Sequence, residues 1–194
     1  LFMVYEAAIC GSCCNFLIAP WVKSELLIVN WGFLFDGLTS IMLMVVCGIS
    51  ACVHLYSCSY MNGDPHQGRF MSYLSLFTGF MLFLVAGDNL IVMFFGWEGI
   101  GLASYLLISF WHTRIQAGKS AIKAMLVNRI GDLGLALSIC SVFLTFKTLD
   151  YSIVFSLANF ASETNFSFLS IGDLFTSFLS GVYTTKYSHI KKKD

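Results

Sequence analysis

Glu98 is the residue of this chain whose type and position most clearly imply chemistry. It lies in the middle of an apolar stretch, residues 89–111, which reads NLIVMFFGWEGIGLASYLLISFW. As a helix this stretch would be roughly 34 Å long, enough to cross the apolar core of a bilayer. A carboxylate near the bilayer midplane is energetically costly and is therefore a candidate functional group. A carboxyl group that binds and releases a proton at that depth would provide one step of a proton pathway.

Three further ionisable residues lie in the apolar segment at residues 121–146. Arg129 and Asp132 are three residues apart, so on a helix they share a face and can form an ion pair. Because only a short loop separates this segment from the preceding one, Arg129 is the candidate cation beside Glu98. Lys123 lies nearer the end of its segment, where its long side chain can reach the interface. We take Glu98, Arg129 and Asp132 as candidate proton-translocation residues and Lys123 as a further candidate.

Each candidate also has a purely structural interpretation. A protonated Glu98 could serve only as a hydrogen-bond donor between helices, and the pair of Arg129 and Asp132 could only hold helices in register. His54, near the end of another apolar segment, is either a packed or interfacial histidine or a further member of a proton relay. The seven cysteines lack the paired spacing and the opposing histidines of a metal site. We expect them to be small buried residues that pack between helices.

The composition of the chain is that of a membrane protein. Of its 194 residues 57% are hydrophobic and only 11% are charged, and the mean hydropathy is +0.77. Soluble domains carry about 25% charged residues, so this chain would need lipid to cover its surface. The formal net charge is zero, which gives no indication of a nucleic-acid partner. No cleavable signal sequence is visible.

The hydropathy pattern predicts an all-α fold, a polytopic transmembrane bundle of about five to six helices. We place a membrane domain at residues 1–150, with a partial first helix within residues 1–19 and a loop at residues 20–25. Four spans are expected at about residues 31–60, 70–87, 89–111 and 121–146. Beyond residue 150 the pattern weakens. Residues 151–194 are therefore interpreted as a divergent segment with one weak span and a polar basic tail.

The predicted loops at residues 61–69 and 112–120 lie on one side of the bundle and, with Lys123, carry four basic residues. On the opposite side Lys23 is accompanied by Glu25 and Lys147 by Asp150. The positive-inside rule assigns the first side to the cytoplasm or to its organellar equivalent, the matrix or stroma. The connection on the opposite side contains Asp88, which we expect to cap the following helix.

Several motifs of this chain closely resemble one known family. Residues 96–111, GWEGIGLASYLLISFW, resemble the fifth-helix motif of the NADH dehydrogenase subunit 5 family, the antiporter-like subunits of respiratory complex I. Residues 123–137, KAMLVNRIGDLGLAL, are similar to the next helix of that family. Three earlier segments of this chain are similar to the preceding parts of that family: WGFLFDGLTSIMLMVV, HLYSCSYMNGDPHQGRFMSYLS and FMLFLVAGDN. The resemblance extends from Trp31 to about Asp150. The sequence Gly-Trp-Glu-Gly at residues 96–99 resembles the mitochondrial form of this motif, whereas chloroplast and Mrp-type subunits tend to have Phe-Trp-Glu-Leu there.

The resemblance implies a proton-translocating module of the mitochondrial inner membrane, driven by quinone reduction elsewhere in the complex. The family's fifth-helix glutamate maps to Glu98, and the arginine and aspartate of its next helix map to Arg129 and Asp132. In the family this glutamate works with a lysine on the seventh helix, which this sequence lacks. We therefore expect a companion chain to supply the rest of the subunit, including that membrane lysine. Other membrane subunits of complex I and lipids are the further expected partners.

The resemblance also implies which cofactors this chain does not hold. NADH, flavin mononucleotide, iron–sulfur clusters and ubiquinone are expected in other subunits, and no cofactor or metal is expected here. The leading hypothesis is a fragment of the distal proton-translocating subunit of NADH:ubiquinone oxidoreductase, a translocase subunit without redox catalysis of its own. One alternative is a subunit of an Mrp-type cation/proton antiporter that uses the sodium gradient. Another is a structural membrane scaffold fragment that does not pump.

Overall fold

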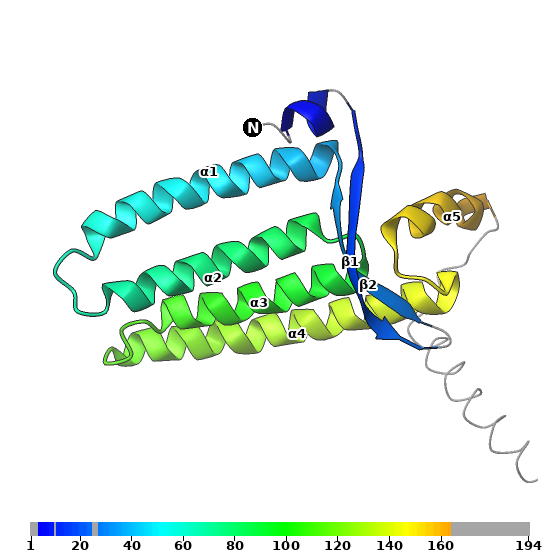
Figure 1. The fold of residues 1–194 in the computed structure, drawn as a ribbon. Helices are drawn as coiled ribbons and strands as arrows, with labels where there is room; N and C mark the ends of the chain where they lie inside the picture. Colours follow the sequence, from blue (N-terminus) through cyan, green and yellow to red (C-terminus); the bar gives the residue numbers. More distant parts are fainter. Residues whose placement is uncertain (1–3, 10, 25–26, 164–194) are drawn as a thin grey trace, which may run out of the picture. The chain divides into compact units, whose positions relative to one another are not determined.

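Four long helices form the membrane part of the chain (Figure 1). The structure is a computed structural model that describes residues 4–9, 11–24 and 27–163. Within those residues, four helices are long and apolar enough to cross a bilayer: α1 Gly37–Tyr60, α2 Gln67–Ala86, α3 Leu90–Ile108 and α4 Ile115–Phe146. The predicted polytopic helical membrane fold is confirmed, although the chain is mostly helical and not all-α, since a β-hairpin precedes the spans.

Consecutive helices pack against one another in chain order, α1 on α2, α2 on α3 and α3 on α4. The connections at residues 61–66, 87–89 and 109–114 are short, and short connections make neighbouring helices antiparallel. Figure 1 shows the first and third of these connections at the same end of the helices. That end carries the basic loops, so it is the end that the positive-inside rule assigns to the inner compartment.

The helix boundaries differ from the predicted spans by several residues. α1 begins at Gly37 and not near Trp31, because Oδ1 of Asp36 accepts the backbone N–H of Thr39 at 2.7 Å and caps the helix there. α2 and α4 begin earlier than the apolar runs that predicted them. Their polar first turns contain no proline that would prevent this. With 20 residues α2 matches the thickness of the bilayer core, whereas α4, with 32 residues, continues beyond it.

A β-hairpin precedes the four helices. Its antiparallel strands are β1 Cys14–Lys23 and β2 Ile28–Phe35, and it follows a short π-helix at Val4–Ile9. The predicted helix is therefore wrong for residues 14–19 and the predicted loop is wrong for residues 20–23. Short apolar runs of this kind are compatible with either a strand or a helix. Pro20 disfavours the helix, and pairing with β2 satisfies the backbone hydrogen bonds instead.

Aromatic rings attach the hairpin to α2 and α3. Trp21 and Trp31, on opposite strands, stack with ring centroids 4.3 Å apart. Both rings meet Phe95 of α3 edge-on, at 6.0 and 5.4 Å. Trp31 also contacts Phe83 of α2, with ring centroids 6.0 Å apart. Edge-to-face and stacked pairs of this kind favour one relative position of the rings, so the cluster helps to position the half of α3 that precedes Glu98.

Asn89 caps α3 and joins it to the hairpin. Its Oδ1 accepts the backbone N–H of Val92 at 2.9 Å, while its Nδ2 donates to the carbonyl of Asn30 at 2.9 Å and to Oδ1 of Asp88 at 2.7 Å. The prediction that Asp88 caps this helix is wrong. The carboxyl group of Asp88 instead lies directly against Gly32, where an added Cβ would overlap it.

The segment after α4 completes this contact region. The N–H of Leu90 donates to the carbonyl of Leu149, and the N–H of Tyr151 donates to the carbonyl of Asp88, both at 3.2 Å. Asn89 and Asp150 also form a β-bridge. We refer to the residues that meet here as the turn junction: Asn30, Gly32, Asp88, Asn89, Leu149 and Asp150.

The chain divides into two compact units between Tyr151 and Ser152, and each is described by itself. The second unit begins within α5, Tyr151–Glu163, whose 13 residues are too few to cross a bilayer. The rest of the predicted C-terminal segment, with its weak span and basic tail, lies outside the described residues.

Candidate functional site

Glu98 lies near the middle of α3, on a helix that glycines hold close to α2. An added Cβ at Gly96 would stand 2.5 Å from the backbone nitrogen of Leu84, and one at Gly99 would overlap the ring of Phe80. These two positions therefore let the helices approach more closely than any larger residue would allow. At 3.6 residues per turn, Trp97 and Glu98 fall on the side of α3 that these glycines leave free.

Glu98 forms an ion pair with Arg129 of α4, with 2.5 Å between Oε2 and Nη1. The same Nη1 lies 3.9 Å from Oδ2 of Asp132, one helical turn further along α4. The structure thus brings together the three residues that the sequence predicts for proton translocation. One guanidinium is shared between two carboxyl groups, and it is much closer to Glu98. Their part in proton translocation stays a prediction.

Asp132 has a second partner that sequence reasoning missed. Its Oδ1 accepts the indole N–H of Trp97 at 2.7 Å, and its own side chain is buried. A tryptophan next to an intramembrane carboxylate is a usable signal, because a buried indole N–H needs a partner. The identity of that partner depends on how α3 and α4 are rotated, which the sequence does not show. We call Trp97, Glu98, Arg129 and Asp132 the mid-membrane cluster.

The cluster opens into a hollow on one side. A space of about 240 Å³ is lined by the side chains of Phe80, Phe95, Leu102, Glu98 and Arg129 and by Gly99. Since one water occupies about 30 Å³ of liquid, several water molecules would fit there. The side chains of Glu98 and Arg129 are 28% and 54% exposed. Their ion pair is therefore accessible from outside this chain, which a proton-exchanging group requires.

Lys123 is not part of the cluster. It lies on α4 nearly two turns before Arg129, towards the basic end, and its side chain is exposed. Within the part of the chain that the structure describes, Lys123 makes no ion pair. This position favours the interfacial interpretation of Lys123.

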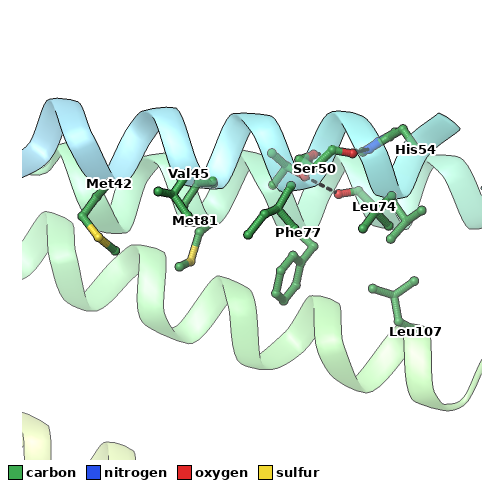
Figure 2. A pocket seen from close by; sticks show the side chains of 12 residues that line it. Met42, Val45, Ser50, His54, Leu74, Phe77, Met81 and Leu107 are labelled. Atoms are coloured by element: carbon green, nitrogen blue, oxygen red, sulfur yellow. Dashed lines mark hydrogen bonds between the residues drawn. The ribbon is translucent and has the colours of Figure 1, made fainter. Parts of the chain in front are cut away.

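His54 lies in a separate polar group between α1 and α2 (Figure 2). Its Nδ1 is 2.8 Å from the carbonyl oxygen of Ser50, and its Nε2 is 3.2 Å from Oγ of Ser75. The hydroxyl of Ser50 is also hydrogen-bonded to Oγ1 of Thr78, at 2.8 Å. Ser50, His54 and Thr78 border an otherwise apolar pocket of about 380 Å³, which shares no lining residue with the hollow beside Glu98. The structure does not bring His54 to the mid-membrane cluster.

The sequence analysis predicted that the cysteines are buried between helices, and this prediction is wrong for the cysteines of the described helices. The thiols of Cys47, Cys52, Cys58 and Cys140 are free and exposed. Among residues 4–9, 11–24 and 27–163, no group of three or more histidine, cysteine or acidic side chains could hold a metal ion.

Two family models match most of the chain. The first, described as NADH-ubiquinone oxidoreductase (complex I), chain 5 N-terminus, matches residues 21–71. The second describes the transmembrane region of NADH:quinone oxidoreductase and the Mrp antiporter, and it matches residues 87–183, half of the chain. The chain belongs to the NADH:quinone oxidoreductase/Mrp antiporter family. It is therefore a membrane protein, and the region around the mid-membrane cluster lies within the second match.

Curated members of this family named NADH-ubiquinone oxidoreductase chain 5 are similar to this chain. The protein of Marchantia polymorpha is 60% identical over 165 residues, which are 85% of this chain and 25% of that protein. The protein of Arabidopsis thaliana is 60% identical over 82% of this chain and 24% of its own length. The protein of Rhizopus stolonifer is 52% identical over 88% of this chain and 26% of its own length. The predicted resemblance to subunit 5 is confirmed, and the chain spans about a quarter of the length of these relatives.

A solved structure of the same family has a similar fold. It is the Mrp complex from Dietzia sp. DQ12-45-1b, one chain of which gives a TM-score of 0.65 at 26% identity. The similarity covers 78% of this chain and 16% of that chain. The fold of this chain thus resembles part of one chain of that Mrp complex.

Proposed function

We propose that this chain forms the N-terminal part of the distal proton-translocating subunit of respiratory complex I, in the mitochondrial inner membrane. The identity of 52–60% to relatives named chain 5 supports this assignment. The observation that carries the chemical part of the proposal is the ion pair between Glu98 and Arg129 near the middle of two membrane helices. Redox catalysis and the sites for NADH, flavin, iron–sulfur clusters and ubiquinone are assigned to other subunits of the complex.

In this proposal Glu98 is the proton-binding group and Arg129 controls its charge. As a carboxylate, Glu98 is stabilised by the guanidinium of Arg129. If Arg129 turns to Oδ2 of Asp132, 3.9 Å away, Glu98 loses its counterion and favours the neutral, protonated form. Return of Arg129 releases the proton again. Conformational changes elsewhere in the complex would drive the cycle by moving the cation.

The charge balance of the cluster indicates that it is incomplete. When both carboxyl groups are ionised, two negative charges face one guanidinium, and an uncompensated charge in a membrane is costly. A further cation beside Glu98 would balance it, as the lysine expected from the family resemblance would do. We assign that cation to the remainder of the subunit, supplied by another polypeptide segment of the complex. The hollow beside Glu98 gives such a group access.

The variant Glu98→Gln tests this function in the assembled complex. Glutamine keeps the size and hydrogen-bonding capacity of the side chain but cannot bind a proton. Because a removed acid–base group cannot be replaced by its neutral isostere, we expect a large loss of protons pumped per NADH oxidised. The control is Asp64→Asn in the connection between α1 and α2, which should pump normally. Normal pumping by an assembled Glu98→Gln complex would refute the proposal.

A second candidate function is cation/proton exchange of the Mrp type, which the similarity to the Mrp complex favours. It differs from the first in its driving force. Transport that depends on a sodium gradient and is indifferent to NADH would support it. The scaffold hypothesis makes a third prediction, since pumping would then survive both Glu98→Gln and Asp132→Asn made separately.

A further inference from the structure

The two oxygens of Asp132 have different partners from two different helices. Oδ1 accepts the indole N–H of Trp97 on α3, at 2.7 Å, and Oδ2 faces Arg129 on its own helix at 3.9 Å. The first distance is a strong hydrogen bond, whereas the second is too long for one. The main stabilising contact of this buried carboxyl group is therefore an uncharged donor and not the nearby cation.

Trp97 contacts the cluster through its N–H group, while much of its ring is not buried within this chain. About half of its surface, 51%, is exposed on this chain. It is adjacent to Glu98 in sequence, and the two side chains reach residues that are one turn apart on α4. As a result, α3 supplies a donor to Asp132 and an acceptor to Arg129 from two consecutive positions.

This arrangement has a consequence for Arg129. A carboxyl group that already accepts a good hydrogen bond gains less from a nearby cation than one that accepts none. The hydrogen bond from the indole thus lowers the free energy that Asp132 would gain by pairing with Arg129. The guanidinium therefore stays with Glu98. Without the indole, Asp132 would be a buried carboxyl group with the guanidinium of Arg129 3.9 Å away.

We propose that Trp97 is a positioning residue that holds Asp132 and thereby sets which of the two carboxyl groups Arg129 pairs with. The inference rests on the proposed function, since it concerns the cation that controls Glu98. It gives this part of α3 two tasks in consecutive residues. Glu98 binds the proton, and Trp97 fixes the resting position of the cation.

The variant Trp97→Phe removes the N–H group and keeps an aromatic ring. A hydrogen bond to a charged group shifts an equilibrium by about tenfold or more when it is removed. We therefore expect Arg129 to move towards Asp132, and the protons pumped per NADH oxidised to fall while NADH oxidation itself continues. The matched control is Trp111→Phe at the C-terminal end of the same apolar stretch, which should keep the ratio of the wild type.

A double variant separates a positioning role from a packing role. If Trp97 acts through Asp132, then Trp97→Phe should cause no further loss in a complex that already carries Asp132→Asn. A packing defect would add to the loss instead, and it would reduce NADH oxidation together with pumping. Additive losses would overturn the inference.

The outcomes also distinguish this inference from the proposed function. If Glu98→Gln stops pumping and an assembled Trp97→Phe complex keeps the wild-type ratio, the role of Trp97 is refuted and the proposed function stands. If Glu98→Gln pumps normally, the proposed function fails and the inference fails with it. Should Trp97→Phe not assemble, the test passes to Asp132→Asn and the ultraviolet resonance Raman band of the indole N–H. This band must move towards weaker hydrogen bonding, and an unmoved band overturns the inference.

Discussion

The mid-membrane cluster and the turn junction both contain two carboxyl groups, yet they are built in opposite ways. In the turn junction Asn89 is fully buried, and three chain segments exchange hydrogen bonds around it. In the cluster Arg129 is 54% exposed, Glu98 borders an open hollow, and only two helices contribute. The junction lies in the connections outside the spans, whereas the cluster lies near their middle.

The difference indicates where this chain folds by itself and where it depends on other protein. The junction closes the hairpin, the α2–α3 connection and the α4–α5 connection upon one another without any outside group. The cluster leaves an ion pair facing outwards, as expected of a chain that spans about a quarter of its relatives. Stability and proposed chemistry are thus placed in separate regions, and substitutions can affect one without the other.

The largest stability effect is expected at Asn89. The substitution Asn89→Ala removes a helix cap, worth about 1 kcal/mol. It also leaves the carbonyl of Asn30 and the carboxyl of Asp88 without their donor, each costing about 1–3 kcal/mol when buried. We expect the free energy of unfolding in detergent micelles, followed by helical circular dichroism, to fall by about 3 kcal/mol.

The control for this prediction is Asp36→Ala, which removes the cap of α1. Asp36 makes the same kind of bond to the backbone, at Thr39, but none of the additional bonds of Asn89. Its loss should therefore cost only about 1 kcal/mol. Equal losses in the two variants would mean that the turn junction adds nothing beyond an ordinary cap.

A smaller effect is expected where α3 meets α2 beside the cluster. In Gly96→Ala the new methyl group would stand 2.5 Å from a backbone atom of Leu84, which cannot move aside as a side chain could. Overpacking of this kind costs about 1–3 kcal/mol. In Gly134→Ala on α4 the methyl group meets nothing within 4 Å, and better helix propensity should add up to about 1 kcal/mol of stability. Opposite signs of the two changes in unfolding free energy are expected, and a stable Gly96→Ala would contradict the close approach.

The sequence predicted the members of the cluster better than the bonds among them. Glu98, Arg129 and Asp132 could be singled out because ionisable residues are rare in apolar spans and a short loop makes their helices neighbours. The position of Trp97 beside Glu98 is a usable signal, but its bond to Asp132 could not be predicted, because that partner depends on the rotation of α3 against α4. The close packing of Gly96 and Gly99 against α2 fixes that rotation, and spacing along one helix does not contain it.

The hairpin and the turn junction show a different limit of prediction. Residues 14–23 are apolar over too short a run to separate a strand from a helix, and the pairing with β2 is a contact between distant positions. Asp88 and Asn89 are both residue types that cap helices. The choice between them depends on Gly32 of the hairpin, against which the Asp88 carboxyl lies. Local residue preference therefore predicted the start of α3 to within one residue, but it assigned the helix cap to Asp88 and not to Asn89.

The smallest effect concerns the two carboxyl groups of the turn junction and depends on pH. Burial, and then the charge of Asp150, raise the pKa of Asp88, and burial also raises the pKa of Asp150. A raised pKa means that the folded state binds the proton more tightly than the unfolded state. The stabilisation is therefore complete at a pH below the ordinary value of 3.8 and is lost as the pH rises through the folded-state pKa.

The variant Asp150→Asn measures the mutual repulsion of this pair. Below pH 3.8, where both carboxyl groups are neutral, the variant and the wild type should unfold with similar free energies. At neutral pH the variant should be the more stable by up to about 1 kcal/mol, since partly solvated charges interact weakly. The readout is the difference between the two unfolding curves as a function of pH, which cancels every other titrating group.

A double variant with Asp88→Asn should show no further gain from Asp150→Asn, because repulsion requires both charges. A difference that is constant with pH would instead assign the effect to packing, and the turn junction would then stabilise the fold through hydrogen bonds alone.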